Sequence, residues 1–284
     1  MRQVKNTMER TKEQLWQQYE LEKALARKLH GATKEERQTL YKSAYDEFFR
    51  TMRHYPQVVH RSEPSTQEKK LSSQLAVLRH FIRRDTNFLE IGAGDCHLSL
   101  KVAGLVKQVY AVEVSEELTK GLAFPSNFKL IITDSCTLNV SPNSVDFAYS
   151  YQLMEHLHPD DALDQLVSIN DALAPGGRYL CVTPNRLNGP WDISRNFDNV
   201  AKGLHLHEYT NSELESKFKQ AGFTRVRAYV RAKGLHLLLP LFPVKMLEFA
   251  LSSMPGDTGR KVANWYPCRR ILGVMLVGTK QSSV

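Results

Sequence analysis

The strongest constraint on the fold is an alternation of short apolar runs with amphipathic segments, which begins after residue 85. The intervening segments, such as residues 160–174, have helical spacing of their apolar residues. Strand–helix alternation of this kind predicts a doubly wound α/β fold with a mainly parallel sheet, covered by helices on both faces. The expected strands are residues 87–93, 108–114, 129–134, 145–150 and 179–184, followed later by 225–230 and 271–278.

The first of these strands runs into a turn that contains two glycines, within FLEIGAGDCHLSL at residues 88–100. Glycine is used where the backbone turns sharply or approaches a ligand closely. A helix that starts after such a turn presents its free N–H groups to the ligand. The dinucleotide motif G-x-G-x-x-G would need a third glycine where this chain has His97. The turn therefore predicts a ligand site and disfavours a nicotinamide dinucleotide.

Acidic residues occupy corresponding places on three successive strands. Glu90 precedes the first glycine, Glu113 ends the second strand and Asp134 ends the third. The carboxyl ends of parallel strands meet at one edge of a sheet, where ligands of such folds bind. A carboxylate at Glu113 can accept two hydrogen bonds from a ribose diol, and one at Asp134 can accept from an exocyclic amine. The series predicts a nucleoside ligand that carries a cationic neighbour.

Together with the glycine turn and the acid series, the segments around them resemble the class I S-adenosylmethionine-dependent methyltransferases over roughly residues 70–280. EIGAGDC (90–96) resembles the first motif of the family, although Cys96 stands where the family often has a third glycine. Three further segments are similar to those around the fourth, fifth and sixth strands: VDFAYSYQLMEHL (145–157), LAPGGRYLCVTPN (173–185) and HLHEYTNSELESKFKQAGF (205–223).

The resemblance implies a seven-stranded sheet whose last strand, residues 271–278, runs antiparallel, and S-adenosyl-L-methionine as the cofactor. Glu113 matches the acid that binds the ribose and Asp134 the acid beside the adenine. The implied cofactor-binding residues are Glu90, Gly92, Ala93, Gly94, Glu113, Val114, Asp134, Ser135 and Tyr151.

Two groups of polar residues are candidates for chemistry on the methyl acceptor. Gln152, Glu155 and His156 follow the fourth strand at spacing i, i+3, i+4, and they share one face if the turn is helical. His205 and His207 precede the helix that follows the fifth strand. Methyl transfer mainly needs the two reactants to be positioned, but a hydroxyl acceptor must also lose a proton. We predict His156, His205 and Glu155 as catalytic residues, with the two histidines as candidate bases.

The same residues resemble two known arrangements. The Glu155–His156 pair resembles one found in several O-methyltransferases. The pattern Q-x-x-E-H together with H-x-x-E-Y-T (205–210) resembles the metal site of the small-RNA 2′-O-methyltransferases, which have a glutamate where this chain has Gln152. Because hard cations prefer charged oxygen ligands, we assign no metal ligand from the sequence.

The remaining segments lie on either side of this core. Residues 1–85 have the apolar spacing of helices, and residues 231–268 form an apolar insertion before the last strand. We expect a methyltransferase domain at 86–284, with the N-terminal extension and the insertion forming a lid over the carboxyl edge of the sheet that selects the acceptor.

Charge and composition narrow the function. Lys and Arg outnumber Asp and Glu by 18 to 11 up to residue 85 and by 10 to 2 from residue 224, whereas the middle has 10 against 17. No apolar stretch reaches the roughly 20 residues of a membrane span, and the start, MRQVKNTMER, lacks the apolar region of a signal peptide. The four cysteines lack C-x-x-C spacing, so we expect a cytoplasmic protein.

The predicted function is O-methylation of a small organic acceptor that bears a hydroxyl group, such as a natural product. RNA methylation, favoured by the basic flanks, is the alternative within enzymes. A non-catalytic protein that binds the cofactor and acts as a partner or sensor is the alternative from another class.

Overall fold

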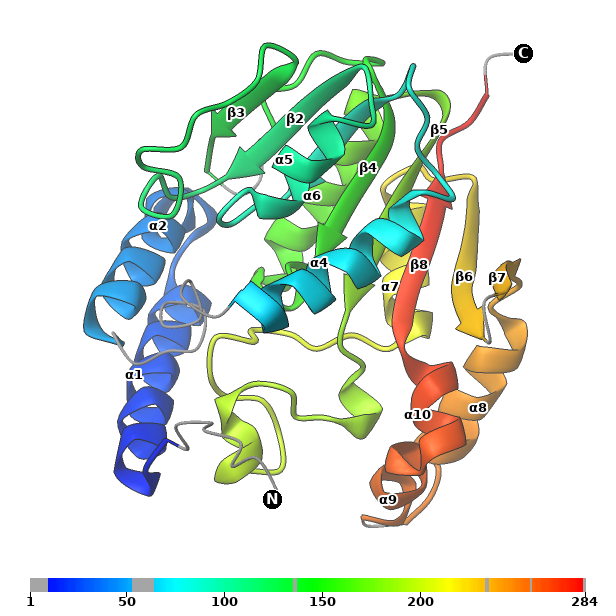
Figure 1. The fold of residues 1–284 in the computed structure, drawn as a ribbon. Helices are drawn as coiled ribbons and strands as arrows, with labels where there is room; N and C mark the ends of the chain where they lie inside the picture. Colours follow the sequence, from blue (N-terminus) through cyan, green and yellow to red (C-terminus); the bar gives the residue numbers. More distant parts are fainter. Residues whose placement is uncertain (1–9, 53–63, 135–136, 233–234, 256, 283–284) are drawn as a thin grey trace, which may run out of the picture.

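The computed structural model describes residues 10–52, 64–134, 137–232, 235–255 and 257–282. Its centre is an eight-stranded sheet with the strand order β3-β2-β1-β4-β5-β8-β6-β7 (Figure 1). The first five strands are parallel: β1 (Asn87–Ile91), β2 (Gln108–Glu113), β3 (Phe128–Ile132), β4 (Val145–Tyr151) and β5 (Leu173–Thr183). β8 (Val274–Thr279) is antiparallel to β5 and to β6 (Arg225–Ala232). The doubly wound, mainly parallel α/β fold is confirmed.

Two details of the sheet differ from the sequence expectation. An eighth strand, β7 (Leu235–Leu239), forms a hairpin with β6 and lies at the edge of the sheet. The last strand begins at Val274 rather than at residue 271, because helix α10 (Tyr266–Leu272) continues into the expected run. An apolar run alone does not distinguish a buried strand from a buried helical segment, and here it contains parts of both.

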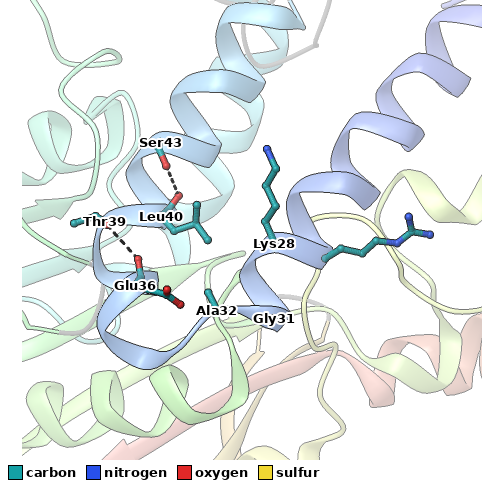
Figure 2. A pocket seen from close by; sticks show the side chains of 8 residues that line it. Lys28, Gly31, Ala32, Glu36, Thr39, Leu40 and Ser43 are labelled. Carbon is teal, nitrogen blue, oxygen red and sulfur yellow. Dashed lines mark hydrogen bonds between the residues drawn. The ribbon is translucent and has the colours of Figure 1, made fainter.

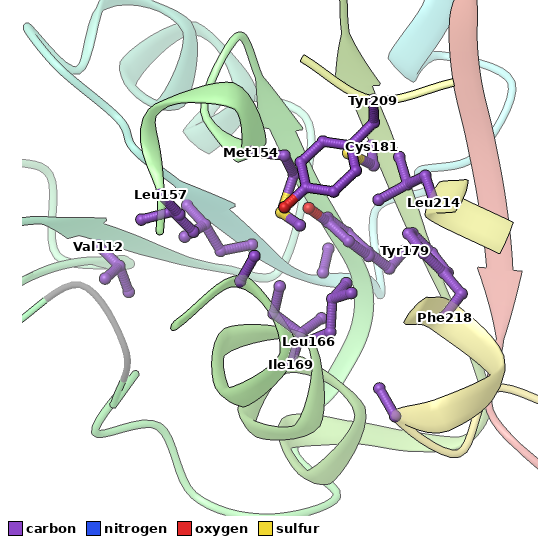
Figure 3. Packing of buried hydrophobic residues seen from close by; sticks show 14 of the residues in the cluster. Val112, Met154, Leu157, Leu166, Ile169, Tyr179, Cys181, Tyr209, Leu214 and Phe218 are labelled. Atoms are coloured by element: carbon purple, nitrogen blue, oxygen red, sulfur yellow. The ribbon is translucent and has the colours of Figure 1, made fainter. Parts of the chain in front are cut away.

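Helices cover both faces of the sheet. α4 (Pro64–Leu78) and α5 (His97–Ala103) lie on one face, where Leu78, Leu98 and Val102 pack with Phe88 of β1. α6 (Pro159–Ala172) and α7 (Asn211–Gln220) lie on the other face (Figure 1). Figure 3 shows part of the core on that face, to which Leu166, Ile169, Tyr179, Leu214 and Phe218 contribute. The expected capping box of Thr210 and Glu213 begins α7.

The N-terminal helices α1 (Lys12–Gly31) and α2 (Lys34–Thr51) extend the core on the α6 side, and each begins with a capping box. Arg37 of α2 donates two hydrogen bonds to Asp161 of α6, at 2.6 and 2.7 Å, and Tyr41 donates a third at 2.7 Å. A depression of about 600 Å³ lies between α1 and α2 and is lined by eight residues of these helices and their connection (Figure 2). None of the candidate site residues lines it.

Between β7 and β8 the chain forms α8 (Phe242–Ser252), α9 (Thr258–Asn264) and α10. Glu248 of α8 accepts hydrogen bonds from Asn185, Asn211 and Ser212, so its carboxylate ties the insertion to the N-terminus of α7 and to the segment after β5. The insertion exposes large apolar side chains, including Phe242 and Phe249 at 70% each. Among the described residues, no helix combines the length and apolar character that crossing a bilayer requires.

Candidate active site

The glycine turn (residues 92–96) joins β1 to α5 at the carboxyl edge of the sheet. Gly92 and Gly94 have φ angles of 72° and 56°, in the left-handed region where glycine is favoured. The N–H groups of Gly92 and Ala93 both donate to the carbonyl of Val112, which fixes the turn against β2. A Cβ atom on Gly92 would lie 3.1 Å from Leu153, so the turn packs directly against the segment after β4.

Cys96 has a φ angle of 57° and is also in the left-handed region, immediately before α5. This conformation costs a residue with a Cβ atom of the order of 1 kcal/mol. The backbone therefore gives a physical reason why related sequences often place glycine here, and the fully buried thiol of Cys96 packs in the core beside α5.

Glu113 holds the turn from the end of β2. Its two carboxylate oxygens accept the N–H groups of Gly94 at 2.7 Å and of Val114 at 2.8 Å. Burial raises the pKa of Glu113, and backbone hydrogen bonds from Gly94, Val114 and Ser115 oppose that rise. The remaining lone pairs of the carboxylate are the acceptors that a ribose diol would use.

The other expected cofactor residues are spread around this turn. Glu90 is 5% exposed and accepts a hydrogen bond from Ser99, and burial raises its pKa to about 8. Asp134 follows β3 and accepts the N–H of Thr137 at 2.8 Å. Tyr151 ends β4, with the ammonium group of Lys70 4.8 Å from its ring centre. Ser135 lies outside the described residues.

The Glu–His cluster (Glu155, His156 and His205) includes the residues that closely follow Leu153, which packs against Gly92 of the turn. Glu155 and His156 belong to a short 3₁₀ helix, η2 (Met154–His156), which follows β4. One ligand atom of each of the three residues lies within 4.8 Å of the others, and the two imidazole rings meet edge to face at 4.9 Å. The three residues that we predicted as catalytic are thus brought together, although the two histidines lie 49 positions apart in the sequence.

Gln152 and His207 do not join the cluster. Gln152 is exposed, has a φ angle of 56° and forms a backbone hydrogen bond to Val182. The His207 ring packs against Tyr209, with ring centres 4.5 Å apart. Its backbone N–H donates to the carbonyl of Glu155 at 3.1 Å, so the main chain of His207 docks its segment on η2.

Hydrogen bonds set the orientation of both imidazoles. His156 Nδ1 lies 3.0 Å from the carbonyl oxygen of Leu204. Because a carbonyl can only accept, Nδ1 carries the hydrogen and Nε2 presents its lone pair. His205 Nδ1 lies 2.7 Å from Glu208 Oε1, which also accepts the N–H of Trp191. His205 therefore also donates from Nδ1 and leaves Nε2 for a ligand.

Burial controls the charge of the cluster. It lowers the pKa of His156 to about 3 and that of His205 to about 4, and it raises the pKa of Glu155 to about 8. Glu155 Oε2 accepts the hydroxyl of Thr183 at 2.7 Å, whereas its Oε1 is buried without a hydrogen-bond partner among the described residues. At neutral pH both imidazoles are uncharged.

Sequence reasoning missed the carboxylates that position this cluster. Glu22 of α1 accepts the N–H of Leu204 at 3.1 Å, and Asp192 accepts that of Gly203 at 2.8 Å. A Cβ atom on Gly203 would lie 2.6 Å from Glu22 and 2.7 Å from Asp192, so glycine is needed where the two side chains converge. Burial raises the pKa of both carboxyl groups, to about 7 for Glu22.

These carboxylates hold Leu204 in place, and Leu204 in turn orients His156. Asp192 lies in the irregular segment before α7, but no sequence pattern indicates that Glu22 of α1 packs against that segment.

The family model for a methyltransferase domain matches residues 63–228, which is more than half of the chain. The chain therefore belongs to the methyltransferase-domain family, as the motifs predicted. The prediction of an S-adenosylmethionine-dependent methyltransferase is confirmed at the level of the family. No curated protein sequence matches the chain.

Many solved structures share the fold. A Burkholderia thailandensis 1,6-didemethyltoxoflavin-N1-methyltransferase, solved with its substrate and S-adenosylhomocysteine, superposes with a TM-score of 0.53 at 18% identity, over 88% of this chain and 92% of that one. A putative methyltransferase in complex with the Haloferax volcanii Trm112 activator gives 0.52 at 14% identity, over 79% and 95%.

A Haemonchus contortus phosphoethanolamine N-methyltransferase 2 in complex with S-adenosyl-L-methionine gives 0.51 at 18% identity, over 74% of this chain and 53% of that one. At these identities the three structures support the fold.

Proposed function

We propose that the protein transfers the methyl group of S-adenosylmethionine to a hydroxyl oxygen of a small organic acceptor. The observation that carries this proposal is the Glu–His cluster, which lies at the carboxyl edge of the sheet beside the glycine turn. Transfer to a hydroxyl requires removal of a proton, and the cluster offers two neutral imidazoles whose Nε2 lone pairs face no donor among the described residues.

The proposed cofactor site is formed by Glu90, Gly92, Ala93, Gly94, Glu113, Val114, Asp134, Ser135 and Tyr151. Glu113 accepts hydrogen bonds from the ribose hydroxyls, and Asp134 accepts one from the adenine amino group. Glu90 lies under the turn, where a buried carboxyl group favours the sulfonium charge. The contacts of Glu113 with Gly94 and Val114 support this arrangement, since they preorganise the turn.

In the proposed reaction the acceptor oxygen attacks the methyl carbon in line with the carbon–sulfur bond. The new carbon–oxygen bond forms while the carbon–sulfur bond breaks, and its electron pair stays on the sulfur of S-adenosylhomocysteine. The hydroxyl proton leaves to His156 or His205. Thr183 and Leu204 keep Glu155 and His156 oriented while this happens.

The N-terminal helices and the insertion are the proposed lid. Tyr45 of α2 lies edge to face against His156, with ring centres 6.0 Å apart, and Glu22 of α1 holds the segment of His205. The insertion reaches the same region through Glu248. The N-terminal helices therefore contact the cluster and its segment, and the insertion contacts the neighbouring segment after β5 and the start of α7. This arrangement supports a layer that selects the acceptor.

Incubation of the purified protein with methyl-labelled S-adenosylmethionine and a cell extract, divided into RNA, protein, lipid and small-molecule pools, tests the proposal. We expect label in the small-molecule pool, in a product whose methyl ether is identified by mass spectrometry. Label in RNA would contradict the acceptor class and favour the alternative that the basic flanks suggest. Cofactor binding without any label would favour a non-catalytic binding protein.

A further inference from the structure

Helix α8 carries apolar side chains on two opposite faces, and one of these faces is exposed. Phe242, Met246 and Phe249 lie at spacing i, i+4, i+7, which places them on one side of the helix, here called the α8 face. Their exposed fractions are 70%, 53% and 70%. Val244 and Leu251 on the other side are buried. Because a helix that is apolar on both sides is normally covered on both, the α8 face is expected to have a partner.

Helices α9 and α10 support α8 and add exposed aromatic residues. Leu251 of α8 packs with Ala263 of α9 and Leu272 of α10 in a small core. Figure 1 shows the three helices grouped together below β6 and β8. Trp265 and Tyr266, at the junction of α9 and α10, are exposed. The α8 face therefore belongs to a packed unit of three helices that presents large apolar and aromatic side chains to the outside.

The acidic residues of this unit are already engaged. Residues 235–272 contain five Lys or Arg and two Asp or Glu. Glu248 is buried under its hydrogen bonds to the start of α7, and Asp257 pairs with Arg260 at 2.7 Å. The charge that the unit presents to its surroundings is therefore positive.

The remaining cations of α9 and α10 keep their charge. Lys261, Arg269 and Arg270 are exposed. The guanidinium of Arg269 lies 5.0 Å from the ring centre of Trp191, and that of Arg270 lies 5.9 Å from the ring centre of Tyr266. An aromatic ring attracts a cation without neutralising it, so both groups can still attract an anionic partner.

The apolar character and the charge together select the kind of partner. A second copy in a two-fold symmetric contact would bring the same cations face to face. A nucleic acid would match the charge but would leave Phe242 and Phe249 in water. An anionic lipid bilayer matches both properties. Apolar side chains enter the boundary between its headgroups and acyl chains, Trp and Tyr favour the headgroup level, and Lys and Arg approach the phosphates.

We propose that the insertion docks the protein on the surface of an anionic lipid bilayer, with the α8 face at the boundary between headgroups and acyl chains. α8 has 11 residues, so it lies in the plane of the interface and does not span the bilayer. Lys261, Arg269 and Arg270 contact the anionic headgroups. The inference concerns binding alone and does not depend on the identity of the methyl acceptor.

Co-sedimentation of the full chain with lipid vesicles measures the docking. We expect binding to vesicles of phosphatidylglycerol and phosphatidylcholine that is at least about 10-fold stronger than binding to phosphatidylcholine alone. Added salt should weaken the binding to the anionic vesicles, because it screens the headgroup charge. Equal affinity for the two vesicle compositions, or binding to neither, would overturn the inference.

Substitution of the α8 face tests the apolar contribution. The double variant Phe242→Ser/Phe249→Ser should bind the anionic vesicles at least about 10-fold more weakly, since two large side chains no longer leave water. Both residues are exposed, so thermal unfolding should be that of the wild type. Val167→Ser, which changes an exposed apolar residue of α6, is the control and should bind normally. Equal vesicle affinity in the double variant and the control would contradict the assignment.

A matched pair of charge variants tests the electrostatic contribution. Lys261→Gln/Arg270→Gln should bind the anionic vesicles about 10-fold more weakly. Lys107→Gln/Lys129→Gln removes the same charge from exposed positions near β2 and β3, at the other end of the strand order from β7, and should bind normally. The same loss in both variants would show that net charge, and not this surface, drives the binding.

Fluorescence distinguishes insertion from adsorption. Lipids brominated on their acyl chains quench a tryptophan that reaches the acyl region. Met246→Trp should therefore be quenched more strongly than the wild type, and Val167→Trp should show no such increase. Equal quenching of the two variants would place the α8 face outside the bilayer.

Two further measurements address the other partners. Sedimentation equilibrium without lipid should give the same oligomeric state for the wild type and Phe242→Ser/Phe249→Ser, and a dimer that only the wild type forms would assign the α8 face to a second copy. RNA binding lost in Lys261→Gln/Arg270→Gln, without vesicle binding by the wild type, would assign the surface to a nucleic acid. The vesicle experiments contain no methyl acceptor, so their failure would leave the proposed function standing.

Discussion

The glycine turn contacts the segment that leads into the Glu–His cluster, but the turn and the cluster are built in different ways. The turn is local: residues 92–96 and Glu113 come from adjacent strands, and two backbone hydrogen bonds to one carboxylate fix it. The cluster is assembled over long range, because His205 reaches η2 on a segment that Glu22 of α1 and Asp192 hold in place.

This difference predicts that the two parts can be damaged separately. Substitutions in the cluster should abolish chemistry and leave the cofactor bound. Substitutions in the turn should weaken the cofactor directly. Substitutions in the N-terminal helices should act on the cluster through stability, since Glu22 of α1 holds Leu204 and Tyr45 of α2 packs on His156.

The largest expected effect is on turnover. His156→Ala and His205→Ala should each lower kcat by about 10²–10⁴-fold, since each removes a group that acts on the acceptor proton. The affinity for S-adenosylmethionine, measured by calorimetry, should stay at the wild-type value. Normal turnover in both variants would show that the cluster has no part in the reaction.

The second effect is on stability and concerns the ion pair between α2 and α6. The side chains of Arg37 and Asp161 are 5% and 1% exposed. In Arg37→Met the carboxylate of Asp161 stays buried but loses its charged partner. Breaking a buried pair from one side costs about 3–5 kcal/mol of unfolding free energy. Denaturant unfolding measures the loss.

Lys34→Met provides the matched control for that experiment. Lys34 also pairs with a carboxylate of α6, Asp164, but both side chains are much more exposed, at 50% and 37%. Exposed pairs contribute about 0–1 kcal/mol. A similar loss in the two variants would show that burial does not set the contribution of the Arg37 pair.

The same contrast explains what the sequence could predict. The turn, the acid series and the capping box at Thr210 are short patterns with one structural solution, so they could be assigned residue by residue. The meeting of His156 with His205 was only a hypothesis, because it depends on Gly203, Glu22 and Asp192, whose contacts span most of the chain. The strand β7 was missed because LHLLL, in which apolar residues face both sides, has no alternating pattern.

A third prediction concerns Glu113 and the cofactor. In Glu113→Gln an NH2 group replaces one carboxylate oxygen. This group cannot accept the N–H of Gly94 or Val114 that the oxygen accepted. Losing one charged hydrogen bond costs about 1.5–3 kcal/mol, so S-adenosylmethionine should bind roughly 10- to 100-fold more weakly. The exposed Glu116→Gln, three residues further along, should bind normally in the same titration. Wild-type affinity in Glu113→Gln would contradict the ribose role.

The last prediction is a pH dependence caused by Glu90, whose effect is the smallest when it is counted per pH unit. Burial raises the folded pKa of Glu90 from the ordinary glutamate value of 4.5 to about 8, so the folded state keeps a proton that the unfolded chain has lost. The contribution of Glu90 to stability is therefore fully present below about pH 4.5 and falls as the pH rises toward 8, by up to about 1.4 kcal/mol per pH unit. Glu90→Gln cannot lose that proton, and its unfolding free energy should fall less between pH 5 and 8 than that of the wild type.

Comparing the two proteins at each pH cancels the contributions of Glu22 and Glu155, whose pKa values are also raised. Bound S-adenosylmethionine should reduce the wild-type slope, because a nearby sulfonium charge stabilises the ionised carboxylate. An identical slope with and without the cofactor would place the sulfonium away from Glu90 and would restrict the cofactor contacts of the turn to Glu113 and the glycine backbone.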